Sequence, residues 1–136
     1  MKNYRAAILG GRRGVHHAAA YKGLENMEVV AICEADNQRR KDVADLLNVA
    51  AYENYEEMLE KEQPDIVHVV TMPTIPRHIW IKSASKVGVQ ALVIEKPIAL
   101  RPRETELLDL VEQETNLKII VNHQRRYLPF AEQLRQ

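Results

Sequence analysis

The chain has 136 residues, enough for one domain with one hydrophobic core, and its 19 basic residues balance its 19 acidic ones. A net charge of zero gives no reason to expect nucleic acid or an anionic membrane as the partner, so the expected ligand is a small molecule. Cys33 is the only cysteine, which excludes an internal disulfide, and no apolar run is long enough for a signal peptide or a spanning helix, so we expect a cytoplasmic location.

Short runs rich in valine and isoleucine predict β-strands. They cover residues 4–9, 28–33, 65–70, 89–94 and 117–122. Most are almost continuously apolar, which is typical of strands in a sheet that helices cover on both faces. Segments with helical periodicity lie between them, such as residues 39–49 and 104–114. This alternation predicts right-handed βαβ crossovers and a single α/β domain with a doubly wound parallel sheet.

The first predicted strand runs into the sequence AILGGRRG, which places Gly10, Gly11 and Gly14 before a helical stretch. Glycines at such a turn let the backbone approach a pyrophosphate, whose charge is stabilised by the N-terminal end of the helix. The spacing is one residue shorter than the Gly-x-Gly-x-x-Gly fingerprint, and a plain turn is the alternative interpretation. We assign the three glycines to a cofactor site.

An acidic residue ends the second predicted strand. Glu34 follows Gly14 by 20 residues, close to the interval of about 20 at which a carboxylate meets the adenosine ribose of NAD. Because a carboxylate repels a 2′-phosphate, NAD is favoured over NADP. Arg12 and Arg13 lie in the glycine turn, where a guanidinium would accommodate that phosphate, so NADP remains the second cofactor prediction. Their alternative role is that of solvated loop charges.

Several residues mark the expected ends of helices. Asp36 is predicted to cap the helix that follows the second strand. A later helix is predicted over residues 75–87, and Gly88 follows it where a residue with positive φ is needed. Pro102 is placed in the first turn of the next helix, which tolerates proline.

Thr71 and Pro73 follow the strand predicted over residues 65–70, and His78 comes five residues after Pro73. Open α/β sheets bind their ligands in the crevice outside the carboxyl ends of the strands. We therefore expect all three residues near the cofactor. For His78 the alternative is a surface or capping residue at the start of a helix.

The next strand ends in the sequence VIEKPI, which places Glu95 and Lys96 at its carboxyl end. Desolvating an ammonium group there is costly, and a neighbouring carboxylate lowers that cost. A lysine beside a nicotinamide ring would hydrogen-bond a substrate hydroxyl and help to move its proton. The alternative is a partly exposed ion pair between Glu95 and Lys96 that contributes little.

Five segments together resemble the oxidoreductase family that includes glucose-fructose oxidoreductase, inositol dehydrogenase and the rhizopine-catabolism protein MocA. They are ILGGRRGVHH, VVAICEAD, PDIVHVVTMPTIPRH, GVQALVIEKPIAL and VNHQRRYLP, of which the Glu-Lys-Pro segment is the most specific. The resemblance implies an NAD(P)-binding Rossmann fold in an enzyme that moves a hydride between nicotinamide and a sugar, polyol or related hydroxyl compound. Two departures are the shortened glycine turn and a spacing from Pro73 to His78 that is one residue longer than usual.

The resemblance also implies roles for individual residues. Lys96 is expected beside the nicotinamide and the substrate as a catalytic residue, and Glu95 and Pro97 are expected to shape the loop that holds it. The residues expected along the cofactor are Thr71, Pro73 and His78. No metal is predicted.

By the same resemblance, residues 1–122 form the dinucleotide-binding domain and residues 123–136 begin the crossing to a C-terminal substrate domain outside this chain. The acid-base partners of the lysine would belong to that domain. We therefore expect the chain to bind the cofactor better than it turns over a substrate. The alternative function is a non-catalytic, nucleotide-sensing regulatory protein of the same fold.

The last residues of the chain carry an apolar pattern. The residues concerned are Tyr127, Leu128, Phe130 and Leu134. They have the spacing of one helix face without a partner, and exposed apolar surface of this kind favours self-association. We expect a homo-oligomer, in the form of a dimer.

Overall fold

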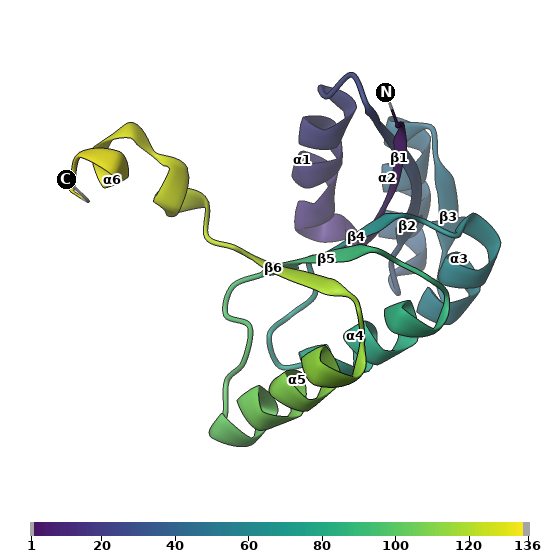
Figure 1. Ribbon diagram of the computed structural model, residues 1–136. Helices are drawn as coiled ribbons and strands as arrows, with labels where there is room; N and C mark the ends of the chain where they lie inside the picture. Colours follow the sequence, from purple (N-terminus) through teal and green to yellow (C-terminus); the bar gives the residue numbers. More distant parts are fainter. Residues whose placement is uncertain (1, 135–136) are drawn as a thin grey trace.

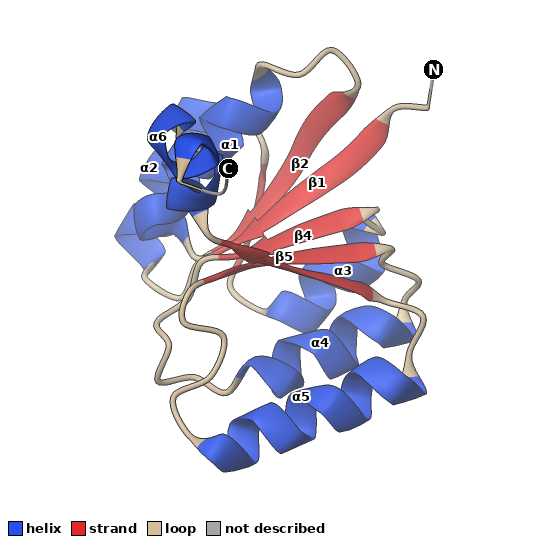
Figure 2. Cartoon of the chain, turned by 60° about the vertical axis from the view of Figure 1, so that its left-hand side comes forward, coloured by secondary structure: helices blue, strands red, loops and turns tan. Residues whose placement is uncertain are grey.

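In the computed structural model, a six-stranded parallel sheet with helices on both faces forms the body of the protein (Figures 1 and 2). The structure describes residues 2–134. The strands are β1 (Tyr4–Leu9), β2 (Met27–Cys33), β3 (Ala50–Tyr52), β4 (Ile66–Val69), β5 (Ala91–Glu95) and β6 (Lys118–Asn122). The helices are α1 (Gly11–Lys22), α2 (Asn37–Leu47), α3 (Tyr55–Glu62), α4 (Arg77–Lys86), α5 (Pro102–Glu114) and α6 (Pro129–Gln133), with a 3₁₀ helix η1 at Gln124–Tyr127.

The strand order is β3-β2-β1-β4-β5-β6, and all neighbouring strands are parallel. The predicted doubly wound parallel sheet is therefore confirmed. The chain moves outward from β1 to β3 and then returns to place β4 on the other side of β1. Such a switch point opens a crevice at the carboxyl ends of β1 and β4, where this class of sheet binds its ligands.

Two separate cores lie on the two faces of the sheet. One core combines alternate strand residues, such as Leu9 and Val69, with Met58 of α3, Ile81 of α4 and Leu108 of α5. The other core combines the remaining strand residues with side chains of α1 and α2. Its buried members are Ile8, Ala18, Val29, Ile32, Val43, Ala44 and Leu47. Because consecutive strand residues point to opposite faces, nearly continuous apolar runs are needed to build both cores.

The helix ends mostly follow the sequence signals. The Asp36 carboxylate accepts a hydrogen bond from the Arg39 backbone N–H at 2.8 Å, and Pro102 lies in the first turn of α5. Gly88 has a φ of +83°, as predicted. The helix predicted over residues 75–87 is shorter, because Pro76 is its N-cap and α4 runs only over Arg77–Lys86. The residue before a proline avoids helical backbone angles, which explains why Ile75 lies outside.

Strand β3 was not predicted from the sequence. It has three residues, Ala50 to Tyr52, and it pairs only with β2 at the edge of the sheet. Two of its three residues are alanines, which favour helices over strands, so local sequence carried no strand signal.

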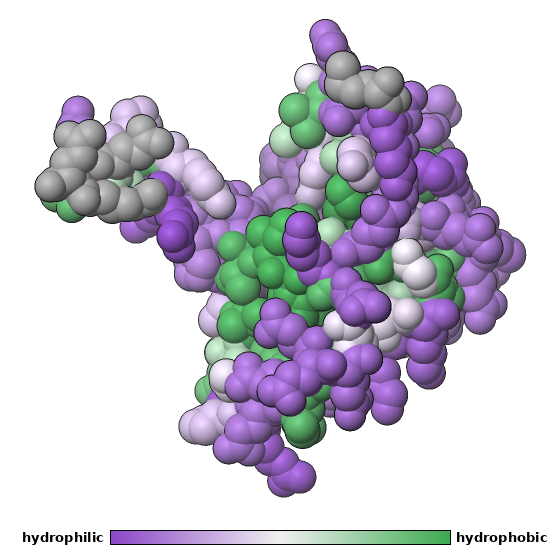
Figure 3. Space-filling model, viewed as in Figure 1, coloured by the Kyte–Doolittle hydropathy of each residue, from purple (hydrophilic) through white to green (hydrophobic). Residues whose placement is uncertain are grey.

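The chain leaves the sheet after β6, and η1 and α6 form an arm that extends away from the body (Figure 1). The four apolar residues predicted to share one face of this arm are all exposed. Apolar surface also lies over the region of β5 and β6 (Figure 3), where the side chain of Ile120 is 44% exposed. Within residues 2–134, no helix is long and apolar enough to span a membrane.

Candidate functional site

The glycine turn joins β1 to α1, and two of its glycines have no room for a side chain. Gly10 has a φ of +105°, and a Cβ atom on it would lie 2.9 Å from the Val70 carbonyl oxygen. A Cβ atom on Gly14 would lie 2.5 Å from the Cγ2 atom of Ile8. Gly10 therefore makes the sharp turn, and Gly14 lets α1 pack closely against β1. These are the roles of the first and third glycines of a dinucleotide fingerprint.

Gly11, the remaining glycine of the turn, contacts the predicted acid. The Gly11 backbone N–H donates to Glu34 Oε2 at 2.7 Å, and the Asp36 N–H donates to Glu34 Oε1 at 3.0 Å. Glu34 is thus held at the N-terminal end of α1, where backbone N–H groups and the helix dipole favour negative charge. The structure brings Gly10, Gly11, Gly14 and Glu34 to one place, although they come from two βα units.

A cavity of about 810 Å³ opens beside this turn. Five predicted site residues line it: Gly10, Arg12, Arg13, Glu34 and Thr71. Its apolar wall was missed by sequence reasoning and includes Tyr55 and Trp80, whose rings meet edge-on with centroids 5.2 Å apart. Burial raises the pKa of the Cys33 thiol, which also lines the cavity, to about 12, so this side chain is uncharged at neutral pH.

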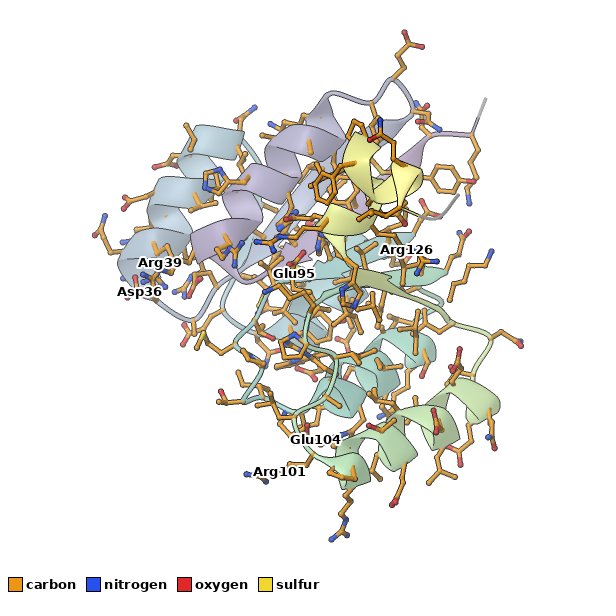
Figure 4. The ribbon with its side chains drawn as sticks, turned by 90° about the vertical axis from the view of Figure 1, so that its left-hand side faces the viewer. Asp36, Arg39, Glu95, Arg101, Glu104 and Arg126 are labelled. Carbon is orange, nitrogen blue, oxygen red and sulfur yellow. The ribbon has the colours of Figure 1, made fainter. Side chains whose placement is uncertain are left out.

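The guanidinium group of Arg39 pairs with the carboxylate of Glu34. Its Nη1 atom lies 3.3 Å from Glu34 Oε1, whereas Arg12 and Arg13 line the same cavity with exposed side chains. Figure 4 shows Asp36 and Arg39 together at the start of α2. Sequence reasoning treated Arg39 as an ordinary helix residue. Its position in the first turn of α2, five residues after Glu34, was the available signal.

The segment after β4 departs from expectation in part. Thr71 lines the cavity, but Pro73 and His78 are not among the lining residues. Arg77 is buried and donates hydrogen bonds to the Thr71 hydroxyl and, at 3.0 Å, to the Thr71 carbonyl. His78 lies in α4, and its buried Nδ1 atom has no partner within the described part of the chain. Arg77 occupies the position that the usual, shorter spacing from Pro73 would give to the histidine.

Glu95 and Lys96 do not form the ion pair considered above. Lys96 is exposed and makes no hydrogen bond or ion pair within residues 2–134, and the peptide bond between Lys96 and Pro97 is cis. Glu95 is buried, and its Oε1 atom is the centre of a side-chain cluster (Figure 4). The members of this cluster, here called the Glu95 cluster, are His17, Tyr21, His68, Glu95 and Asn122.

Three side chains lie around one carboxylate oxygen in the Glu95 cluster, and hydrogen bonds join Asn122 and His68 to it. Glu95 Oε1 lies 2.5 Å from Asn122 Nδ2, 3.2 Å from His68 Nε2 and 3.4 Å from His17 Nε2. The two histidine rings lie against each other with centroids 4.2 Å apart, and the Tyr21 hydroxyl lies 3.1 Å from His68 Nδ1. Sequence reasoning assigned no site role to His17 or His68. The alternation of β4 and β5, which places His68 and Glu95 on one face of the sheet, was the available signal.

Burial determines the protonation of this cluster. It lowers the pKa of His17 and that of His68, and it raises the pKa of Tyr21 to about 12. Burial alone would raise the pKa of Glu95, but the hydrogen bonds from Asn122 and His68 outweigh it, and the pKa lies below its ordinary value. At neutral pH the cluster therefore contains two neutral imidazoles around one carboxylate.

The same atoms have the spacing of a metal site. One ligand atom from each of His17, His68 and Glu95 lies within 4.8 Å of the others. However, the Asn122 amide already donates a hydrogen bond to the Glu95 oxygen at 2.5 Å. A hydrogen-bonded cluster describes these residues better than a metal centre.

Comparison with known proteins gives concordant results. Residues 4–123 match the model of an oxidoreductase family with an NAD-binding Rossmann fold, GFO_IDH_MocA. The chain is 26% identical to D-apiose dehydrogenase of Paraburkholderia graminis in an alignment of 132 residues that covers 95% of this chain and 34% of that protein. It is 29% identical to UDP-N-acetylglucosamine 3-dehydrogenase of Acidithiobacillus ferrooxidans in an alignment of 137 positions that covers 100% of this chain and 42% of that protein.

Solved structures show the same relationship. The crystal structure of myo-inositol 2-dehydrogenase from Lactobacillus plantarum matches with a TM-score of 0.84 and 28% identity, over 98% of this chain and 41% of that one. The apo scyllo-inositol dehydrogenase from Lactobacillus casei matches with a TM-score of 0.84 and 26% identity, over 98% of this chain and 41% of that one. The chain thus spans less than half the length of the relatives it matches.

Proposed function

Because the chain belongs to the oxidoreductase family with an NAD-binding Rossmann fold, we propose that it is the cofactor-binding part of an NAD-dependent dehydrogenase acting on a sugar, a polyol or a related hydroxyl compound. The relatives named above are sugar, nucleotide-sugar and inositol dehydrogenases, which supports this substrate class. We propose that residues 1–122 form this part and that residues 123–136 begin the crossing to a substrate domain.

The observation that carries the proposal is the contact between the glycine turn and Glu34 at the mouth of the cavity. No Cβ atom fits at Gly10, so the turn offers a bare backbone cradle for a pyrophosphate. Glu34 would bind the hydroxyl groups of the adenosine ribose, and the wall of Tyr55 and Trp80 would contact the adenine ring.

The preference for NAD follows from the charge at Glu34, since a carboxylate there repels a ribose 2′-phosphate. Arg39 opposes this preference, because its positively charged guanidinium group lies close to the same site, with Nη1 3.3 Å from Glu34 Oε1. Replacing the carboxylate by an amide would leave this guanidinium without its partner and ready to bind a phosphate. NAD is therefore the proposed cofactor, and the selectivity against NADP would depend on a single charge.

At the nicotinamide end of the cofactor, we propose that Lys96 contacts the substrate. The nicotinamide, when bound, accepts or donates the hydride. The exposed Lys96 ammonium group would hydrogen-bond the oxygen on the reacting carbon, polarise it, and assist the transfer of its proton. The solved relatives are longer than this chain, which covers 41% of them. The remaining acid-base groups would therefore come from outside these residues.

Calorimetric titration of the 136-residue chain with NAD and NADP tests the proposal. We expect NAD to bind with a Kd of about 1 mM or tighter, and NADP to bind more weakly. Trp80 lines the cavity and is the only tryptophan, so its fluorescence should change with the same Kd. If a folded chain binds neither dinucleotide at millimolar concentration, the proposal is wrong.

A variant of Glu34 tests the site itself. Glu34→Gln keeps an acceptor for the Gly11 N–H but removes the charge, so we expect the ratio of NAD to NADP affinity to shift toward NADP by about tenfold. Glu28→Gln, an exposed change on the same strand, is the matched control and should leave this ratio unchanged. An unchanged ratio in Glu34→Gln would place the adenosine ribose elsewhere.

A further inference from the structure

Arg77, at the start of α4, is a buried cation without an acidic partner. It is 3% exposed, and within residues 2–134 its Nε atom has no hydrogen-bond partner and no carboxylate forms an ion pair with it. It is also the first residue of α4, where the positive end of the helix dipole disfavours a cation. Burying an unpaired charge is costly. The stability of the fold therefore does not explain an arginine in this position.

The two terminal nitrogen atoms of Arg77 both bind one residue. Nη1 donates to the Thr71 hydroxyl, and Nη2 donates to the Thr71 carbonyl oxygen at 3.0 Å. A guanidinium group only donates, so the hydroxyl oxygen is the acceptor and its own hydrogen remains available for another acceptor. Because Thr71 lines the cavity beside the glycine turn, that second acceptor would be an atom of a bound ligand.

Thr71 lies where the end of β4 meets the glycine turn. The N–H of Val70, the residue before it, donates to the Leu9 carbonyl at the end of β1 at 2.7 Å. A Cβ atom on Gly10 would lie 2.9 Å from the Val70 oxygen and 3.3 Å from the Thr71 nitrogen. The peptide group between Val70 and Thr71 thus packs directly on the turn, at the switch point between β1 and β4. Any shift of Thr71 would change the shape of the crevice there.

We propose that Arg77 is a positioning residue for the cofactor. Its guanidinium group holds both oxygen atoms of Thr71, fixes the preceding peptide group against Gly10, and leaves the Thr71 hydroxyl to donate to a phosphate oxygen of a dinucleotide at the glycine turn. Anionic oxygens are strong acceptors, and the positive charge of Arg77 strengthens a hydrogen bond from the hydroxyl that it contacts. This inference rests on the proposed function.

Calorimetric titration of the 136-residue chain with NAD tests this role. Arg77→Met removes both hydrogen bonds and should weaken NAD binding about tenfold. Arg77→Lys keeps the charge but lacks the planar pair of donors, so it should weaken binding about threefold. Ile81→Val is the matched control, because Ile81 is fully buried one turn further along α4 and does not line the cavity. It should lower Tm but leave the Kd for NAD unchanged.

A double-mutant cycle shows whether Arg77 acts through Thr71. Thr71→Val removes the hydroxyl and should also weaken NAD binding about tenfold. The double variant Thr71→Val/Arg77→Met should bind NAD no more than about twofold more weakly than Thr71→Val alone. Additive losses, an unchanged Kd in Arg77→Met, full recovery of affinity in Arg77→Lys, or an equal loss in Ile81→Val would each overturn the inference.

Amide hydrogen exchange of the ligand-free chain separates this inference from the proposed function. The Val70 amide, which is hydrogen-bonded to Leu9, should exchange about fivefold faster in Arg77→Met than in the unsubstituted chain, but not in Ile81→Val. Arg77→Lys gives the same comparison if Arg77→Met does not fold. Unchanged exchange at Val70 would overturn the inference, whereas failure of the unsubstituted chain to bind NAD would overturn the proposed function.

Discussion

Two carboxylates of this protein lie at the carboxyl edge of one sheet, Glu34 just after β2 and Glu95 at the end of β5, but they are held in different ways. Glu34 accepts from two backbone N–H groups and pairs with the partly exposed side chain of Arg39. Glu95 is buried and accepts from side chains alone. The backbone donors to Glu34 lie at the starts of α1 and α2, whereas the hydrogen-bond donors to Glu95 lie on β4 and β6.

Titratable residues of the Glu95 cluster make the stability of the folded chain depend on pH. Burial lowers the pKa of His68 to about 4 in the folded chain, compared with about 6.5 when unfolded. Between these values the unfolded chain binds a proton that the folded chain does not, so stability falls as the pH falls. Glu95, whose pKa is also lowered, adds to the loss at still lower pH. We expect Tm to fall by about 5 °C or more between pH 7 and pH 4.5, measured by circular dichroism.

Variants separate this effect from general acid sensitivity. His68→Gln cannot titrate, so its Tm should fall less between the same two pH values. His123→Gln, an exposed change after β6, should follow the unsubstituted chain. A fall of equal size in all three proteins would show that other groups control the acid sensitivity.

At the scale of elements, the contact of α1 with β1 depends on Gly14. A Cβ atom there would lie 2.5 Å from Cγ2 of Ile8, which is fully buried. Gly14→Ala should therefore push α1 away from the sheet, lower the free energy of unfolding by about 2 kcal/mol and weaken NAD binding, because the glycine turn moves with the helix. Denaturant unfolding and calorimetry provide the two measurements.

Gly23→Ala is the matched control for this change. Gly23 ends α1 with a φ of −78°, and the nearest atom to a Cβ there, the Ala20 carbonyl oxygen, would be 3.3 Å away. An alanine is compatible with this backbone, so we expect a change below about 1 kcal/mol. If the two variants lose the same stability, close packing at Gly14 is not what holds α1 in place.

At the scale of the whole molecule, the exposed apolar arm predicts self-association. Tyr127 is 73% exposed and Phe130 54% exposed, and both lie beyond β6 on the arm. Light scattering should show a dimer with twice the chain mass of 15.6 kDa. The double variant Leu128→Ser/Phe130→Ser should be monomeric, whereas Leu46→Ser, an exposed change on α2, should stay dimeric. A monomeric unsubstituted chain would contradict this prediction.

The amino-acid sequence by itself determined the architecture and indicated that the glycine turn and Glu34 belong together, which the structure shows as a hydrogen bond. Continuous apolar runs, the cap at Asp36 and the positive φ at Gly88 depend on neighbours within a few residues, so local patterns predicted them correctly. Glu34 was predictable because its distance from Gly14 along the chain is set by one βα unit. The missed strand β3 is the exception, since its pairing with β2 and not its composition makes it a strand.

Only the tertiary structure decided which distant side chains meet. The Tyr55 and Trp80 wall of the cavity and the Glu95 cluster depend on the strand order and on the register of β4, β5 and β6. The same chain patterns would allow Glu95 to pair with Lys96 beside it, but the two-residue period of a strand turns Glu95 inward toward His68 and leaves Lys96 exposed. Local periodicity determines which face a residue occupies, and only the order of the strands determines what it finds there.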